Sequence, residues 1–128
     1  MADTHPPAVL VVDDDSTIRS VIAELLLIEG YLVRTAANGR EALEILRAWR
    51  PHLIVLDLMM PVMDGWAFRA AQRALPGALR DIPVVILSAT RDVERHATEL
   101  GAATAIPKPF DLDQVVATVA AIAGRPPR

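Results

Sequence analysis

Short apolar runs alternate with helix-periodic segments along nearly the whole chain, and this alternation constrains the fold more than any other feature. The runs occupy residues 9–12, 31–33, 53–56 and 83–87, with a weaker fifth run at about 103–106. The central runs are apolar throughout rather than at every second position, which is typical of strands covered on both faces. We therefore expect an α/β fold: a doubly wound, five-stranded parallel sheet with helices on both faces.

Helix-capping residues separate the expected strands and helices. Ser16 is predicted to cap the first helix, and Gly30 stands where a glycine would end it. Asn38, followed three residues later by Glu41, resembles a capping box for the second helix. The apolar stripe of that helix is expected to continue as far as Trp49.

Composition limits the function. The chain has 128 residues, within the range of about 100–200 that is usual for one domain. It has no cysteine, which excludes thiol catalysis, cysteine-based zinc sites and redox switching. A net charge of −3 and an aromatic content of 4% give no support to nucleic-acid binding. No apolar run approaches the roughly 18 residues that span a bilayer, so we expect no membrane insertion and a cytoplasmic location.

Four of the expected strands lead directly into charged or hydroxyl-bearing side chains. The residues concerned are Asp13, Asp14 and Asp15 after the first strand, Asp57 after the third, Ser88 after the fourth and Lys108 after the fifth. Ligands of open α/β sheets bind at the carboxyl ends of the strands, near the point where the strand order reverses. We therefore expect these side chains to line one site at that edge.

Acids gathered at such a site require a positive charge nearby. Two like charges about 4 Å apart cost roughly 4 kcal/mol at an effective dielectric constant of about 20. Lys108 supplies one cation, and an all-oxygen site favours Mg²⁺ or Ca²⁺ as another. Mg²⁺ suits an open strand-end site better, because it needs few carboxylates and accepts phosphate oxygens. The Asp57 carboxylate would then attack phosphorus and form an aspartyl phosphate, with Lys108 and Ser88 stabilising the transferred group.

Simpler interpretations exist for several of these residues. The first acids would also serve as helix caps, Ser88 as a turn residue and Lys108 as a solvated side chain. Capping gives no role to Asp57, however, because Asp57 directly follows four apolar residues. The three histidines are scattered without metal-ligand spacing and are interpreted as surface or capping residues.

The chain resembles the receiver domain of two-component response regulators. The matching stretches are VLVVDDDS (residues 9–16), LIVLDLMMPVMDG (53–65), VVILSA (84–89) and PKPF (107–110). They follow the family's order and spacing over nearly the whole chain. The resemblance implies a flavodoxin-like sheet with strand order 2-1-3-4-5. We expect this domain to occupy residues 8–123, between a flexible lead (1–7) and a flexible tail (124–128).

The resemblance also implies a phosphorylation site with a bound metal. Asp57 matches the phosphoacceptor of the family. Asp13 and Asp14 match the acidic pair that holds Mg²⁺, together with Asp57 and the backbone carbonyl of Met59.

Further matches and two departures concern the switch. Ser88 matches the family's switch hydroxyl and Lys108 its phosphate-pairing lysine, whose bond to Pro109 is commonly cis in the family. Ala105 stands where regulators of this type often carry an aromatic residue, so the signal cannot pass through a ring at that position. Met59, an apolar residue two positions after the acceptor, is expected to shield the phosphoryl group from water.

By this resemblance the chain is a phosphorylation-dependent signalling switch. A sensor histidine kinase or a phosphotransfer protein would donate a phosphoryl group to Asp57, and the altered surface would bind a downstream target protein. We expect no turnover of an independent substrate, and a monomer or weak dimer. No output-domain sequence follows Gly124, which indicates either a stand-alone regulator or part of a longer one, and the initial Met1 favours a natural start.

Alternatives to this interpretation are open. Asp13-x-Asp15-x-Thr17 matches a motif of haloacid-dehalogenase-type phosphatases, in which Asp13 would be the nucleophile and Asp15 the acid and base. That interpretation leaves LIVLDLMMPVMDG unexplained, and the chain has no room for a cap domain. A degenerate receiver would bind partners without phosphorylation, although the complete set of acids, hydroxyl and lysine argues against it. A nucleotide-binding protein is disfavoured because neither G-x-G-x-x-G nor G-x-x-x-x-G-K occurs.

Overall fold

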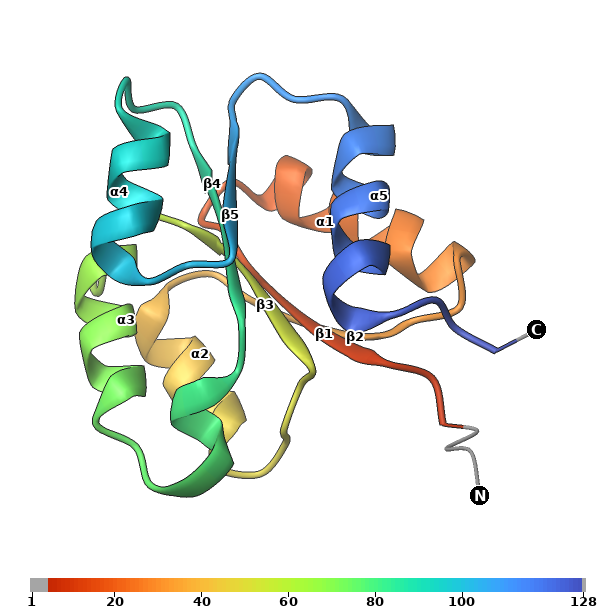
Figure 1. Cartoon of the computed structure of the whole chain (residues 1–128), viewed down its shortest axis with the longest axis horizontal. Helices are drawn as coiled ribbons and strands as arrows, with labels where there is room; N and C mark the ends of the chain where they lie inside the picture. The colour runs from red at the N-terminus through yellow and green to blue at the C-terminus, as the bar shows by residue number, and fades with distance from the viewer. Residues whose placement is uncertain (1–4, 128) are drawn as a thin grey trace.

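A five-stranded parallel sheet forms the centre of the computed structural model, which describes residues 5–127 (Figure 1). The strands are β1 (Ala8–Val12), β2 (Leu32–Ala36), β3 (Leu53–Asp57), β4 (Val84–Ser88) and β5 (Thr104–Pro107). They lie in the order β2-β1-β3-β4-β5, and every neighbouring pair is parallel. The predicted doubly wound sheet and its strand order are therefore confirmed.

Helices cover both faces of this sheet. They are α1 (Ser16–Ile28), α2 (Gly39–Leu46), α3 (Gly65–Arg73), α4 (Val93–Leu100) and α5 (Leu112–Ala123), with a short 3₁₀ helix, η1 (Gly77–Asp81), before β4. Figure 1 shows α1 and α5 on one side of the sheet and α2, α3 and α4 on the other. This arrangement explains why the central strands are apolar along their whole length, since neither face of β1, β3 or β4 meets solvent.

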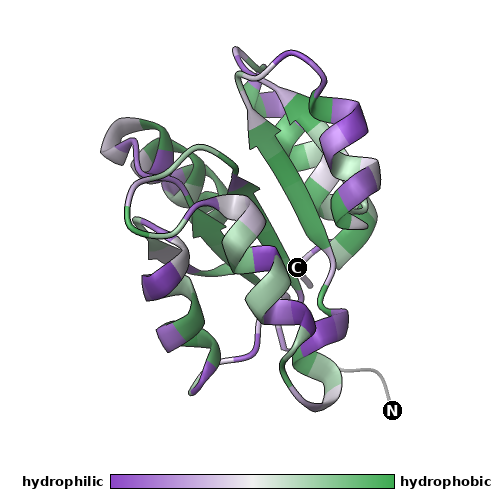
Figure 2. Ribbon diagram, turned by 90° about the vertical axis from the view of Figure 1, so that its left-hand side faces the viewer, coloured by the Kyte–Doolittle hydropathy of each residue, from purple (hydrophilic) through white to green (hydrophobic). Residues whose placement is uncertain are grey.

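Two hydrophobic cores result, one on each face of the sheet. Val9 and Val11 pack with α1 and α5, whereas Leu10 and Val12 pack with α2, α3 and α4. Figure 2 shows the strands in the hydrophobic colour and hydrophilic residues concentrated on the helices and loops. Each fully buried leucine or valine stabilises the fold by about 1.5–3 kcal/mol, so these layers hold the strand ends firmly in place.

The first two helices show how capping fixes their starting points. The N-cap of α1 is Asp15, whose carboxylate accepts hydrogen bonds from the backbone of Thr17 and Ile18. The prediction that Ser16 caps this helix is therefore wrong by one residue, because the carboxylate of the preceding residue reaches the free N–H groups first. The Asn38 cap of α2 is confirmed by a bond of 3.0 Å from the Glu41 N–H.

The second helix is shorter than its apolar stripe. It ends at Leu46, so the prediction that it reaches Trp49 is wrong. Trp49 lies in the following turn, where it still packs against the core and sits 5.1 Å beneath the Arg34 guanidinium. The apolar spacing continues past the end of α2 because Trp49, although outside the helix, packs against the same core as the helix does.

Candidate functional site

The carboxyl edge of the sheet gathers the charged and hydroxyl side chains that follow the strands. Asp57 is the last residue of β3 and Ser88 the last residue of β4, while Asp13 follows β1 and Lys108 follows β5. These strands are neighbours in the order β1-β3-β4-β5. Consequently, residues that are up to 95 positions apart in the chain meet at one edge.

Three carboxylates meet closely at this edge and are called the acid pocket here. Asp13, Asp14 and Asp57 each offer a carboxylate oxygen, and these oxygens lie within 4.8 Å of one another. Asp13 is fully buried and Asp57 is 4% exposed, whereas Asp14 is exposed to solvent. Two of the three charges are therefore removed from water, which is costly without compensating partners.

The Lys108 ammonium joins two of these carboxylates. Its Nζ donates a hydrogen bond of 2.9 Å to Asp13 Oδ2 and lies 3.6 Å from Asp57 Oδ1. The Lys108 backbone N–H donates to the Ser88 carbonyl at 2.8 Å, which ties the loop after β5 to the end of β4. The peptide bond between Lys108 and Pro109 is cis, as the resemblance implies.

Further hydrogen bonds fix the position of Asp13. Its Oδ1 accepts a bond of 2.9 Å from the Asp15 backbone N–H. Its own N–H donates to the Ala36 carbonyl, and its carbonyl accepts a bond of 2.7 Å from Arg19 Nη1 on α1. Both carboxylate oxygens of Asp13 are thus engaged, while the Asp15 carboxylate is committed to the start of α1.

Burial and charge shift the acid–base properties of the pocket. Burial, followed by the neighbouring charge of Asp13, raises the pKa of Asp57 to about 6, although Lys108 opposes this rise. Burial alone would lower the pKa of Lys108, but its bond to Asp13 and the charges of Asp13 and Asp57 hold that pKa above its usual value. Lys108 therefore stays positively charged while Asp57 resists ionisation.

The acid pocket has the donor chemistry of a divalent-cation site. Three ionised carboxylates against one ammonium leave two negative charges uncompensated at the edge of the sheet. All candidate ligands are oxygen atoms, which favours Mg²⁺ or Ca²⁺ over softer metals. The exposure of Asp14 leaves one side of the pocket open to solvent, as a metal that keeps bound water requires. The residues present therefore fit a magnesium ion.

The Ser88 hydroxyl is engaged away from the acids. Ser88 is fully buried, and its Oγ lies 3.0 Å from Thr90 Oγ1 and accepts a bond of 3.1 Å from the Thr90 N–H. Thr90 was not among the predicted site residues. The signal that would have found it is a second hydroxyl two residues after the first, a spacing that allows a local turn with a shared hydrogen bond.

The loop between β3 and α3 is tightly folded beside Asp57. Val62 has a positive φ of 68°, within a turn closed by a 2.7 Å bond from the Met63 N–H to the Pro61 carbonyl. A positive φ is strained for a β-branched residue. Gly65 begins α3 so close to β3 that a Cβ there would lie 2.7 Å from the Asp57 carbonyl oxygen. Position 65 therefore accepts glycine alone without a shift of β3.

Met59 lies in the same loop. Its side chain is 60% exposed, and its backbone N–H donates a hydrogen bond to the Asp57 carboxylate. Ala105, on β5, is half-buried and packs against the core formed with α2, α3 and α4. The small side chain of Ala105 leaves that core without a ring at this position.

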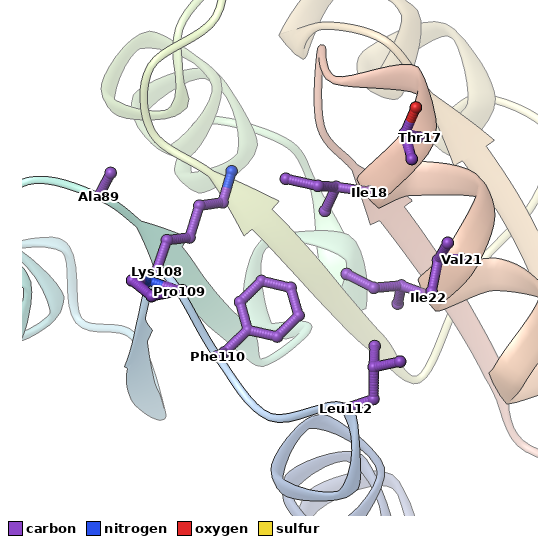
Figure 3. A pocket seen from close by; sticks show the side chains of 9 residues that line it. All are labelled: Thr17, Ile18, Val21, Ile22, Ala89, Lys108, Pro109, Phe110 and Leu112. Carbon is purple, nitrogen blue, oxygen red and sulfur yellow. The ribbon is translucent and has the colours of Figure 1, made fainter.

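An apolar hollow of about 550 Å³ lies beside the acid pocket. It is lined on one side by α1 residues such as Ile18 and Val21, and on the other by Phe110 and Leu112 after β5. Figure 3 shows the Lys108 side chain extending from this loop, with its nitrogen at the tip of β3. The hollow could not be predicted from the sequence, because its walls come from segments about 90 residues apart.

Among residues 5–127, none of the helices combines the length and the apolar character needed to cross a bilayer.

Known proteins share this sequence pattern. The response regulator receiver domain family matches residues 9–120. The chain is 42% identical over 121 residues to the transcriptional regulatory protein PrrA of Mycobacterium tuberculosis, covering 93% of this chain and 51% of PrrA. It is 38% identical over 122 residues to the response regulator MprA of Mycolicibacterium vanbaalenii, covering 94% and 52%. The chain thus spans about half the length of the curated relatives it matches.

Solved structures share the fold. The chemotaxis response regulator CheY4 of Vibrio cholerae superimposes with a TM-score of 0.82 at 32% identity, covering 91% of this chain and 98% of that one. A putative response regulator from Chloroflexus aurantiacus gives a TM-score of 0.83 at 32% identity, covering 94% and 99%. The chain therefore belongs to the response regulator receiver domain family, whose members act as phosphorylation-dependent signalling switches.

Proposed function

We propose that Asp57 accepts a phosphoryl group from a phosphohistidine of a partner protein. In this reaction an oxygen of the Asp57 carboxylate forms a bond to phosphorus, the phosphorus–nitrogen bond breaks, and the electron pair returns to the imidazole. The observation that supports this assignment is the position of Lys108, whose ammonium lies 2.9 Å from Asp13 and 3.6 Å from Asp57. This cation lies where the charge of the transferred group would develop.

Asp13, Asp14, Asp57 and the backbone carbonyl of Met59 would hold Mg²⁺ in this proposal. When bound, the ion would supply positive charge to the oxygens of the phosphoryl group. The protein's own contribution is to hold Asp13 rigidly through Lys108 and the Asp15 N–H, and to leave Asp14 open to solvent. The raised pKa of Asp57 would fall when a cation binds, because a nearby positive charge favours the ionised form.

The switch in this proposal involves Ser88. Its Oγ lies 3.0 Å from Thr90 Oγ1, and in this proposal the Ser88 hydroxyl directs its proton to a phosphoryl oxygen on Asp57. The phosphoryl group adds about −1.5 to −2 charges at neutral pH, which gives both Lys108 and Ser88 a new acceptor. Movement of Ser88 and Thr90 would then alter the loop between β4 and α4, and with it the surface that binds a target.

The partner in this proposal is a sensor histidine kinase or a phosphotransfer protein. The apolar hollow between α1 and the loop after β5 adjoins Lys108 and offers such a donor a contact surface beside Asp57. Beyond its own phosphorylation and dephosphorylation, the chain is expected to turn over no separate substrate. A monomer or weak dimer and a cytoplasmic location are expectations that rest on family membership, and a protein target completes the proposal.

The phosphatase alternative lacks support from the geometry. In that alternative Asp15 would act as acid and base, yet its carboxylate accepts hydrogen bonds from the Thr17 and Ile18 N–H groups at the start of α1. Asp13, the nucleophile of that alternative, is buried and bonded to Lys108. The match of residues 9–120 to the receiver family favours Asp57 instead.

Phosphorylation by a small phosphodonor tests the proposal. The protein would be incubated with acetyl phosphate and Mg²⁺, and the added mass would be measured for wild type, Asp57→Ala and Asp57→Asn. We expect one phosphate on the wild type and none on either variant. Asp64→Asn is the matched control, because it removes a carboxylate from the cap of α3 and leaves an oxygen for the same hydrogen bond. Phosphate on Asp57→Asn at the wild-type level would overturn the assignment.

A phosphate mimic separates a working receiver from a degenerate one. Beryllofluoride in Mg²⁺ should shift the backbone NMR signals of Ser88, Thr90 and the start of α4. A spectrum that stays unchanged would favour the degenerate receiver.

A further inference from the structure

A buried guanidinium lies far from the acid pocket, between α3 and the end of α4. Arg69 is 6% exposed. Its Nε donates to the Leu100 carbonyl at 2.9 Å, its Nη2 to the Gly101 carbonyl at 3.0 Å, and its Nη1 to Gln72 Oε1 at 2.7 Å. All three acceptors are uncharged, so no carboxylate accounts for the burial of this cation.

Two further arginines surround the same place. Arg73, one turn along α3, directs its guanidinium over Gly101, into the space that a Cβ at that position would need. Arg80, from η1, completes the group, and the three arginines line a hollow of about 390 Å³. We call Arg69, Arg73 and Arg80 the arginine cluster. The hollow lies at the amino-terminal ends of β4 and β5, beside Pro83 and Ala103.

The arginine cluster carries more positive charge than its surroundings offset. Within residues 5–127, neither Arg69 nor Arg73 has a carboxylate within 4.0 Å. Asp81 also lines the hollow and offsets one of the three charges, with its carboxylate 4.0 Å from Arg80 and both of those side chains largely exposed. The carbonyl end of α4 supplies a partial negative charge of about −0.5 to Arg69, which is less than one full charge. Arg73 also lowers the pKa of Arg69, second to burial, which shows that the two cations repel each other.

The interior of the cluster is rigid. Gln72 is fully buried, and its amide donates to the Leu79 and Ile82 carbonyls at 3.0 and 3.1 Å, so Arg69 is held from both sides. The three hydrogen bonds of Arg69 use three of the five N–H groups of its guanidinium, which leaves two for a ligand. A rigid cation needs little ordering when a ligand arrives, and this lowers the entropic cost of binding.

We propose that the hollow lined by Arg69, Arg73 and Arg80 binds a small phosphate monoester, with the phosphate on the guanidinium groups. Guanidinium groups donate in a planar fork that matches the oxygens of phosphate. Three guanidinium groups around one hollow suit a ligand with two negative charges better than they suit a ligand with a single carboxylate. A volume of about 390 Å³ is within the usual range for small-molecule sites, and Ile82, Pro83 and Ala103 provide apolar surface for the organic part. This proposal does not depend on phosphorylation of Asp57, since the two sites lie at opposite ends of the strands.

Titration with phosphate compounds tests this site. Inorganic phosphate and glycerol 3-phosphate would be added to the ¹⁵N-labelled chain at constant ionic strength, with EDTA present so that the acid pocket repels anions. We expect saturable shifts at Gly101, Ala103 and the Arg69 Nε signal, with tighter binding of the monoester. Arg73→Gln should weaken binding roughly ten- to hundredfold, because it removes one charge-assisted contact.

Matched controls separate this site from general attraction of anions. Arg95→Gln removes an exposed arginine of α4 that pairs with Glu99, so it changes net charge equally and should leave binding intact. Gly101→Ala displaces the Arg73 guanidinium and should weaken binding while the charge is unchanged. Linear, unsaturable shifts, or equal losses with Arg73→Gln and Arg95→Gln, would overturn the proposal. Tighter binding of inorganic phosphate than of the monoester would overturn the assignment of a monoester as the ligand.

Discussion

The proposed phosphoacceptor, Asp57, lies in a place that disfavours its charge. It is 4% exposed, close to the carboxylate of Asp13, and its pKa is raised to about 6. Under the proposed function, burial would favour attack on phosphorus, because it has removed part of the hydration of the Asp57 carboxylate. Lys108 keeps enough positive charge nearby for the ionised form to persist at neutral pH.

The raised pKa of Asp57 predicts how stability depends on pH without metal. Below 3.8 both folded and unfolded chains hold the proton, so Asp57 costs nothing, whereas above about 6 the folded chain carries the full penalty. Asp57→Asn should therefore increase the free energy of unfolding at pH 8 in EDTA by about 2–3 kcal/mol. Urea unfolding of both proteins measures this gain. The gain should vanish as the pH falls below 3.8, and a variant less stable than wild type at pH 8 would contradict the prediction.

Met59 is expected to govern how long the phosphoryl group survives. Met59 stands two residues after Asp57 and is 60% exposed, and in this prediction its apolar side chain shields the phosphoryl group from water. Met59→Asn would place a hydrogen-bonding group there and should shorten the lifetime several-fold. Decay of the phosphorylated protein, followed by mass spectrometry, measures this. Val62→Asn, an exposed residue in the same loop, is the control and should leave the decay unchanged.

At the scale of elements, the junction of β4 and α4 is the part that the proposed switch would change. Ser88 ends β4 in full burial, and Thr90 accepts or donates its hydroxyl bond at 3.0 Å. In the proposed switch a phosphoryl group on Asp57 accepts a hydrogen bond from Ser88, so a Ser88 hydroxyl that donates to Thr90 would oppose switching.

Removing the Thr90 hydroxyl should favour the phosphorylated arrangement. Thr90→Val deletes one hydrogen bond of roughly 1 kcal/mol, so beryllofluoride should bind about fivefold more tightly in Mg²⁺. Calorimetry of beryllofluoride binding measures the change. Thr98→Val is a matched control, because the Thr98 hydroxyl bonds only to Glu94 within α4. Unchanged affinity in Thr90→Val would show that Ser88 is not restrained by Thr90.

The strands of this fold could be predicted from the sequence, whereas several details of the loops and caps could not. Strands that are apolar throughout are recognisable because burial on both faces leaves no polar positions, and side chains after them fall at one edge of any parallel sheet. Asp15 rather than Ser16 caps α1 because the Asp15 carboxylate accepts hydrogen bonds from the Thr17 and Ile18 N–H groups. The Ser88–Thr90 pair required the turn geometry, and the apolar hollow required knowledge that residues 17–22 and 108–112 face each other.

At the scale of the whole molecule, the acid pocket links two separate cores. Strands β1 and β3 lie between the two hydrophobic layers and lead to Asp13 and Asp57 at one edge of the sheet. A cation that neutralises the excess negative charge there should therefore stabilise the entire domain. A ligand that binds the folded chain alone adds stability in proportion to its concentration relative to its dissociation constant.

Magnesium should therefore raise the stability of the metal-free protein. At about a hundredfold excess over the dissociation constant the gain is about 2.7 kcal/mol. Asp14→Asn should remove most of it without harming the fold, because Asp14 is exposed. Asp15→Asn changes the charge equally and keeps a capping oxygen, so it should retain the gain. Thermal unfolding with and without Mg²⁺ measures each case, and a wild type indifferent to Mg²⁺ would count against the metal site.

The acid pocket and the arginine cluster lie at opposite ends of the strands, so these two groups of charge contribute an electric dipole component along the strands. A charged surface approached in solution exerts a torque on such a body, presenting the acidic end to basic partners and the basic end to acidic ones. At an ionic strength of about 0.15 M the field decays over about 8 Å, so this alignment acts only in the last moments of an encounter. Two molecules bound at once would meet the domain from opposite poles and would not compete for space.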